Sequence, residues 1–266
     1  MAERVTQNTF EAASTVTDGQ WLVPDGWQQG RGAWGGLVVA AHLRAVHALD
    51  PARTVRTIAC QIPAPVPTGA HRCAVTPVRI GSGMSTWQSA MSGVDSGEVV
   101  SVATVLQAQP RELADFPSIT GTVSRPDAPD AGEVPVIPVA PPLGPVFAEH
   151  LQFRVISGIP MSGGEPRCLG WIDIPDGAQW DAFRLLAIVD AWWPCVLVAL
   201  STVRPMATVD FTAHLLVDPA TIPSGPLLVD NRLLAEHEGF TTEVRRLWTA
   251  DGRLVVENLQ SIAVIR

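Results

Sequence analysis

The sequence of 266 residues contains no tyrosine and no cluster of lysine or arginine. Its formal net charge is −8, whereas a nucleic-acid surface needs grouped positive charge, so nucleic acid is excluded as the expected partner. The four cysteines form neither a C-x-x-C pair nor a zinc spacing, which predicts reduced and mostly buried thiols. None of the six histidines pairs as H-x-x-x-H, so the helical signature of a zinc hydrolase is missing and no metal is expected.

Targeting and membrane-spanning segments are also missing from the sequence. The N-terminal stretch MAERVTQNTFEAAS has no apolar core of the kind found in signal peptides, which predicts a cytoplasmic protein. The longest apolar run, from Leu185 to Leu200, is interrupted by Asp190 and Pro194. Because a membrane span needs roughly 20 apolar residues, this run is interpreted as a buried helix instead.

Two common catalytic signatures are absent or incomplete. Gly30, Gly32 and Gly35 have the spacing G-x-G-x-x-G, but the residues before them are broken by Pro24 and Gly26 and form no buried strand. A dinucleotide site requires that strand, so the glycines need another explanation. No G-x-S-x-G nucleophile elbow is present either, which disfavours a serine hydrolase.

Proline divides the chain into two halves. Residues 110–146 are so rich in proline that no helix or inner strand is expected there, which predicts a linker between repeats at 1–109 and 147–266. The halves resemble each other. Thr86 aligns with Thr242 and, after a one-residue slip at the turn, Val105 aligns with Gln260. The apolar helices align so that Gly35 falls on Asp190.

Each half is predicted to hold one apolar helix followed by antiparallel strands, which is an α+β architecture. The last hairpins are expected to turn at VDSGE and ADGRL. The segment ATVDFTAHLLV alternates as a strand does, which places Phe211 on one face and both Thr208 and His214 on the other.

Asp190 is the most informative candidate for chemistry. A carboxylate within FRLLAIVDAWWPCVLVAL costs several kcal/mol to bury unless its surroundings compensate. Pro194 cannot donate to the carbonyl of residue 190, so the helix is expected to bend there. Two interpretations stay open at this point: Asp190 acts as a catalytic base, or it caps the second part of the helix. His42, Thr208 and Gln260 taken singly have ordinary structural explanations.

Together these segments resemble the acyl-CoA thioesterase II family, the double hotdog thioesterases, over nearly the whole chain. WGGLVVAAHLRA is similar to the helix start of that family, and VDAWWPCVLVAL, ATVDFTAHLL and EVRRLWTADGRLVVENLQ are similar to its C-terminal half in order. The resemblance implies two tandem hotdog repeats, each with a long helix against an antiparallel sheet. It also implies that the family's catalytic Asp, Thr and Gln are Asp190, Thr208 and Gln260.

The activity implied by the resemblance is hydrolysis of an acyl-CoA to a free fatty acid and CoA by activated water, without a cofactor. Asp190 would act as base or orient the water, and Thr208 and Gln260 would fix its position. The helix start at Gly35 and Gly36 would polarise the thioester carbonyl through an amide, with Gly36 the first choice. Since the N-terminal repeat lacks a second trio, we expect one site per chain, between the halves.

The resemblance leaves the recognition of CoA and the assembly of the chain as expectations. The CoA phosphates would have to be met by single arginines, for which the candidates are Arg31, Arg44, Arg72 and Arg79. We expect a homodimer, because sheet edges and helix faces in such folds tend to be covered by another chain.

Two alternatives to the thioesterase stay open from the sequence. One is a non-catalytic acyl-binding protein in which Trp192 or Trp193 fills the pocket. The other is a hotdog hydratase, which would need a histidine with the helical Asp, and His214 is the candidate.

Overall fold

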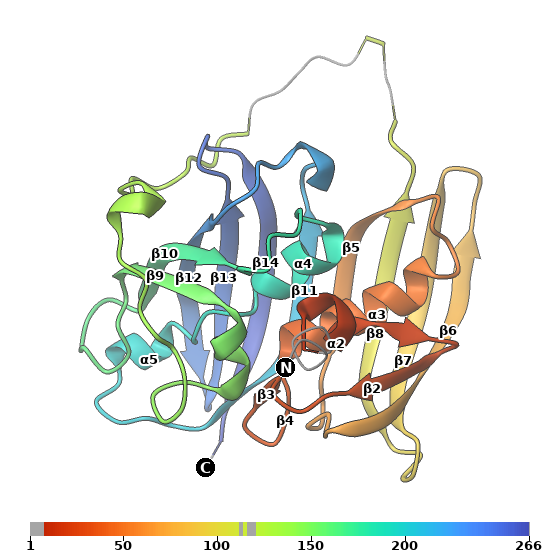
Figure 1. Cartoon of the computed structure of the whole chain (residues 1–266), viewed down its shortest axis with the longest axis horizontal. Coiled ribbons are helices and arrows are strands. Elements are labelled where there is room, and N and C mark those ends of the chain that lie inside the picture. Colours follow the sequence, from red (N-terminus) through yellow and green to blue (C-terminus); the bar gives the residue numbers. More distant parts are fainter. Residues whose placement is uncertain (1–7, 112–113, 116–120, 266) are drawn as a thin grey trace.

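The computed structural model describes residues 8–111, 114–115 and 121–265. Their largest feature is one antiparallel sheet of twelve strands, with two packed helices near its centre (Figure 1). The strand order is β1-β2-β6-β7-β8-β5-β11-β14-β13-β12-β10-β9, so each half of the chain supplies one half of the sheet. The predicted α+β double hotdog architecture is confirmed.

The N-terminal half contains a central helix that precedes the main strands of its part of the sheet. The bounds of its elements are α2 Phe10–Ser14, β1 Val16–Thr17, β2 Gln20–Val23, β3 Gln28–Gln29, β4 Gly32–Ala33, α3 Gly35–His47, β5 Thr54–Gln61, β6 Gly69–Ile80, β7 Met84–Gly93 and β8 Val99–Ala108. The hairpin between β7 and β8 turns within the predicted segment VDSGE.

The C-terminal half repeats this order with a shorter, interrupted helix. The bounds of its elements are η1 Ala131–Glu133, η2 Val146–His150, β9 Gln152–Ser157, β10 Arg167–Asp173, α4 Ala182–Ile188, α5 Val196–Ala199, β11 Met206–Leu215, η3 Pro219–Thr221, β12 Leu227–His237, β13 Phe240–Trp248 and β14 Leu254–Val264. The hairpin between β13 and β14 turns within ADGRL, as predicted. None of the helices in the described residues is long and apolar enough to cross a membrane.

The two halves join where β5 pairs with β11, with Cys60 opposite Phe211. Above this seam, α3 and α4 pack with opposite directions: the start of α3 at Gly36 meets Ala187 near the end of α4, and the ring of His47 at the end of α3 lies 5.4 Å from that of Phe183. The repeat alignment of Gly35 with Asp190 is therefore wrong, since one begins its helix and the other lies beyond the end of its helix.

The proline-rich segment covers part of the sheet in the C-terminal half. Trp171 Nε1 donates to the Pro129 carbonyl (3.0 Å), and Val134 belongs to a small apolar cluster with Trp171 and Trp248. This cluster is separate from the main core that contains both central helices. The alternation of β10 explains the separation, because Cys168 and Ile172 join the main core whereas Trp171 faces the opposite side.

Candidate functional site

The predicted helix through Asp190 stops short of it. α4 ends at Ile188, α5 begins at Val196, and Asp190 lies in the break between them. The helix is interrupted rather than bent, and Pro194, which has no N–H to donate, lies within the interruption. The capping interpretation is wrong: Cys195 precedes α5, and its N–H donates to Glu243 Oε2 (2.7 Å) rather than to Asp190.

Gln260 connects the three residues that the resemblance singled out. Its Nε2 lies 2.8 Å from Asp190 Oδ1 and 2.7 Å from Thr208 Oγ1, and it donates to both oxygens. Asp190 is 6% exposed and Gln260 is 1% exposed, while Thr208 is half-buried. Three segments that are far apart in the sequence therefore meet at one largely enclosed polar cluster.

Thr208 reaches this cluster through an irregularity in β11. Thr208 pairs with Ile262 and Asp210 pairs with Ser261, so the register shifts at Val209. The bulge places Thr208 on the same face as Phe211, which pairs with Gln260. The simple alternation expected from the sequence, which put Thr208 and Phe211 on opposite faces, is wrong at this residue.

Gly35 and Gly36 lie directly against the Asp190 segment. A Cβ on Gly35 would approach Asp190 Oδ2 to 2.7 Å, and one on Gly36 would approach the Ala187 carbonyl oxygen to 2.4 Å. The glycines thus allow the start of α3 to touch the end of α4. The Gly36 N–H faces the Asp190 carboxyl and lowers its pKa.

Burial dominates the ionisation of Asp190. Desolvation raises the pKa of its carboxyl above the ordinary value of 3.8, although the Arg245 guanidinium, the Gln260 hydrogen bond and the Gly36 amide each act to lower it. A buried carboxylate with a raised pKa and few direct partners has the properties of a general base.

One acceptor atom in the cluster has no protein donor. Gln260 Oε1 is buried, and no donor among the described residues bonds to it. Because the Nε2 group of the same amide donates to Asp190 and Thr208, Oε1 is the remaining polar atom of this amide. The cluster therefore combines a buried carboxylate with an amide oxygen that has no donor among the described residues.

The two tryptophans after Asp190 pack into the C-terminal half. The Trp192 ring lies 5.4 Å from that of Phe153 on β9, and a Cβ on Gly170 of β10 would touch it. Trp193 Nε1 donates to the Gly158 carbonyl (2.8 Å). The Trp192 indole thus packs against β9 and β10, and the Trp193 indole is hydrogen-bonded to the loop that follows β9.

The histidines considered from the sequence lie outside the cluster. His214 is exposed and pairs with Thr57 and Glu257, on the opposite face of β11 from Phe211. His42 is buried in the N-terminal half, where its ring nitrogens contact the hydroxyls of Ser89 (2.8 Å) and Ser101 (3.0 Å). Burial lowers the pKa of His42 to about 4, so it is a neutral packing residue at neutral pH.

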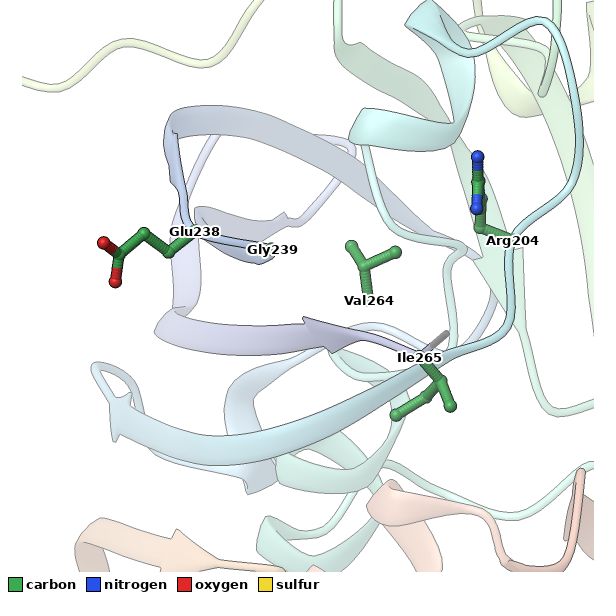
Figure 2. A pocket seen from close by; sticks show the side chains of 5 residues that line it. All are labelled: Arg204, Glu238, Gly239, Val264 and Ile265. Atoms are coloured by element: carbon green, nitrogen blue, oxygen red, sulfur yellow. The ribbon is translucent and has the colours of Figure 1, made fainter.

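An open pocket of about 620 Å³ lies beside the start of β11, the end of β14 and the turn between β12 and β13, and it is lined by Arg204, Glu238, Gly239, Val264 and Ile265. Figure 2 shows Val264 between Gly239 and Arg204, with the Glu238 carboxylate extending away. Val264 shares a face of β14 with Gln260 and lies two residues, roughly 7 Å, beyond Ile262, the partner of Thr208.

Arg204 did not stand out in the sequence, because it is a single cation between the predicted helix and strand. It is exposed and forms no ion pair within the part of the chain that the structure describes. Of the arginines expected from the sequence, Arg44 is already bound to Glu11 (2.5 Å) and Ser14, whereas Arg31, Arg72 and Arg79 are exposed.

Comparison with known families gives two matches that together cover most of the chain. The acyl-CoA thioesterase N-terminal domain matches residues 23–108, and the acyl-CoA thioesterase C-terminal domain matches residues 123–264. No curated protein matches the sequence.

Solved structures share the fold over almost their full length. A hot dog fold protein of unknown function from Alicyclobacillus acidocaldarius is 25% identical, with a TM-score of 0.87 over 97% of this chain and 98% of that one. A proposed thioesterase II from Thermobifida fusca is 20% identical, with a TM-score of 0.80 over 97% of each chain. An acyl-CoA thioesterase II from Mycobacterium marinum is 15% identical, with a TM-score of 0.73 over 97% of this chain and 98% of that one.

Proposed function

The chain belongs to the acyl-CoA thioesterase family, whose N- and C-terminal domains it contains, and from this premise we propose that it hydrolyses an acyl-CoA thioester with a water held by Asp190, Thr208 and Gln260. The observation that carries the proposal is the hydrogen bonding of Gln260. Its amide donates to Asp190 and Thr208 and keeps Oε1 as a buried acceptor, for which the described residues supply no donor. In this proposal the attacking water lies within reach of both Gln260 Oε1 and the Asp190 carboxylate.

In the proposed reaction, the water oxygen attacks the thioester carbon while Asp190 takes one of its protons. The carbonyl oxygen becomes an oxyanion, which accepts from the amides at the start of α3. Because the Gly36 N–H already faces Asp190, we assign the larger share of this role to Gly35, with Gly36 next to it. The carbon–sulfur bond then breaks, the CoA thiolate takes a proton from Asp190 and leaves, and a free acid remains.

The test is release of free thiol from acyl-CoA esters of increasing chain length. We expect release from at least one ester, at a rate proportional to protein concentration. Absence of release from every ester would favour the non-catalytic alternative, although the packing of Trp192 against β9 and β10 gives that alternative no support. Incubation with an α,β-unsaturated acyl-CoA tests the hydratase alternative, which the position of His214 does not favour. A hydratase would add water to the ester, seen as a mass increase of the intact thioester without release of thiol.

The pH dependence of hydrolysis is expected to follow Asp190. The base is active only when ionised, so kcat/KM should fall as pH drops through its pKa, which burial raises above 3.8. The acid limb is therefore expected above about pH 4, measured with initial rates at constant ionic strength. An acid limb at or below the ordinary pKa of an aspartate would contradict the assignment of Asp190 as the buried base.

Recognition of the CoA phosphates is proposed to involve Arg204. Arg204→Gln is expected to raise KM for acyl-CoA by about 2- to 5-fold with kcat unchanged, because an exposed ion pair contributes at most about 1 kcal/mol. KM for the matching acyl-pantetheine, which lacks the nucleotide phosphates, should not change. Arg111→Gln, at an exposed arginine after β8 that is not among the candidates for the CoA phosphates, is the matched control. An equal rise of KM for both esters would argue against a phosphate contact.

A further inference from the structure

Behind the catalytic cluster lies a buried ion pair formed by Glu243 and Arg245 of β13. Glu243 is 0% exposed and Arg245 is 1% exposed. Arg245 Nε donates to Glu243 Oε1 (2.8 Å), and Nη2 of the guanidinium also contacts that oxygen. The sequence gives no hint of this, because charged residues in a strand that alternates are ordinarily assigned to the solvent face.

The pair supplies the hydrogen bonds that the break between α4 and α5 removes. Arg245 Nη1 donates to the carbonyls of Val189 (3.4 Å) and Trp192 (3.0 Å), on either side of Asp190. Glu243 Oε2 accepts from the Cys195 N–H (2.7 Å) at the start of the next helix. The main-chain groups exposed by the break therefore bond to two side chains of one strand, which fixes the path of residues 189–195.

The same pair stands beside the reacting groups. Arg245 Nη1 is 3.9 Å from Asp190 Oδ1, and Glu243 pairs across the sheet with Gln260. The Nε and Nη2 groups of Arg245 are bound to Glu243. The Arg245 guanidinium is therefore close to Asp190 but forms no two-point ion pair with it. Asp190 Oδ2 lies against Gly35, on the side where the attack would take place.

We propose that Arg245 and Glu243 are positioning residues, which hold Asp190 in the helix break and set its readiness to accept a proton through opposite charges. This inference rests on the proposed function only in so far as Asp190 is the base. A purely structural purpose explains it poorly, because a buried ion pair is often no more stabilising than apolar residues of similar volume. Two charges of opposite sign near one carboxylate act on it in opposite directions.

The other ionisable groups around Asp190 do not provide this control. Burial raises the pKa of the Cys60 thiol on β5 to about 12, so it is neutral at working pH. The pKa of the Cys195 thiol is also raised, first by its contact with the Cys168 thiol and then by burial. Asp210 on β11 accepts from Gln61 Nε2 (2.8 Å), on the face opposite Phe211. The near charges that remain are those of Glu243 and Arg245.

The test compares the acid limb of the pH profile in Arg245→Met and Glu243→Gln. In Arg245→Met, which lacks the cation, the acid limb is expected to move to higher pH by roughly one unit. In Glu243→Gln, which lacks the anion, it is expected to move to lower pH by a similar amount. In both variants kcat should fall more than KM changes, and Arg245→Lys should restore the position of the limb while kcat stays low. Arg246→Met is the matched control, because Arg246 follows Arg245 on β13 and its ion pair with Glu257 of β14 (2.7 Å) lies on the solvent side.

A second readout does not depend on activity. Titration of the Asp190 carboxyl carbon by NMR of 13C-labelled protein, assigned by its loss in Asp190→Asn, should show the same opposite shifts. If wild type hydrolyses no ester but the shifts occur, the proposed function fails and the control of Asp190 stands. Shifts of the same sign, or none, overturn the inference. If Arg245→Met does not fold, Glu243→Gln is compared with the double variant that carries both substitutions. The Asp190 titration should lie at higher pH in the double variant than in Glu243→Gln, because only the double variant lacks the cation, and an equal or lower position overturns the inference.

Discussion

Replacing Asp190 with asparagine is expected to lower kcat for acyl-CoA hydrolysis by about 10³-fold, which is typical for loss of a general base. The change is nearly isosteric, and the asparagine oxygen can still accept from Gln260 Nε2, which lies 2.8 Å from Asp190 Oδ1. KM should change little, because the carboxylate acts on the water rather than on the acyl group or CoA. Free-thiol release under saturating substrate measures the effect.

The variant needs a control for folding and a test of cooperation within the cluster. Circular dichroism and the melting temperature should stay close to wild type. Gln260→Ala is expected to be impaired on its own, since it releases both Asp190 and Thr208. Combined with Asp190→Asn it should add little, because groups that act on one water are not additive. Activity of Asp190→Asn within tenfold of wild type would remove Asp190 from the role of base.

Much of the fold was predictable because its helices and strands have periodic patterns of apolar residues in the sequence. The apolar helix at residues 35–47, the alternating strands and the hairpin turns all follow from local preferences that the packed structure keeps. The separation of the two halves follows from their internal similarity. These features do not depend on which side chains meet across the core.

The geometry of the site was predictable only in part. Asp190 stood out as a carboxylate in an apolar run, and the resemblance added Thr208 and Gln260. A single-residue bulge at Val209 decides that Thr208 faces the other two. Bulges depend on cross-strand pairing, which one strand's alternation does not contain. The alignment of Gly35 with Asp190 rested on the apolar pattern of the two segments, and this pattern does not show that α4 ends before Asp190.

The buried pair of Glu243 and Arg245 lay beyond sequence reasoning for an energetic reason. Local patterns place charge in solvent because burying an unpaired charge costs several kcal/mol. Here the cost is offset by contacts with carbonyls and an N–H that a helix break leaves free about 50 residues away along the chain. Only the folded structure brings those groups together.

Gly36→Ala is expected to lower the stability of the fold more than any of the other proposed substitutions. Its Cβ would lie 2.4 Å from the Ala187 carbonyl oxygen and 2.4 Å from the Trp34 ring, and the carbonyl belongs to a packed helix that has little freedom to retreat. Overpacking of this kind costs about 1–3 kcal/mol or more, which outweighs the gain in helix propensity of about 1 kcal/mol. We expect the melting temperature to fall by several degrees, measured by calorimetry.

Alanine at the neighbouring Gly35 should separate activity from stability. Its Cβ would lie 2.7 Å from Asp190 Oδ2, a side-chain atom that can move by rotation of the carboxylate. Gly35→Ala is therefore expected to keep a melting temperature near that of wild type but to lose most of its kcat, because the base is displaced. Gly83→Ala, where a Cβ would meet no atom within 4 Å, is the matched control for both. If Gly35→Ala instead kept full kcat while Gly36→Ala melted normally, the close contact between α3 and the Asp190 segment would be contradicted, and with it the reason these glycines begin the helix.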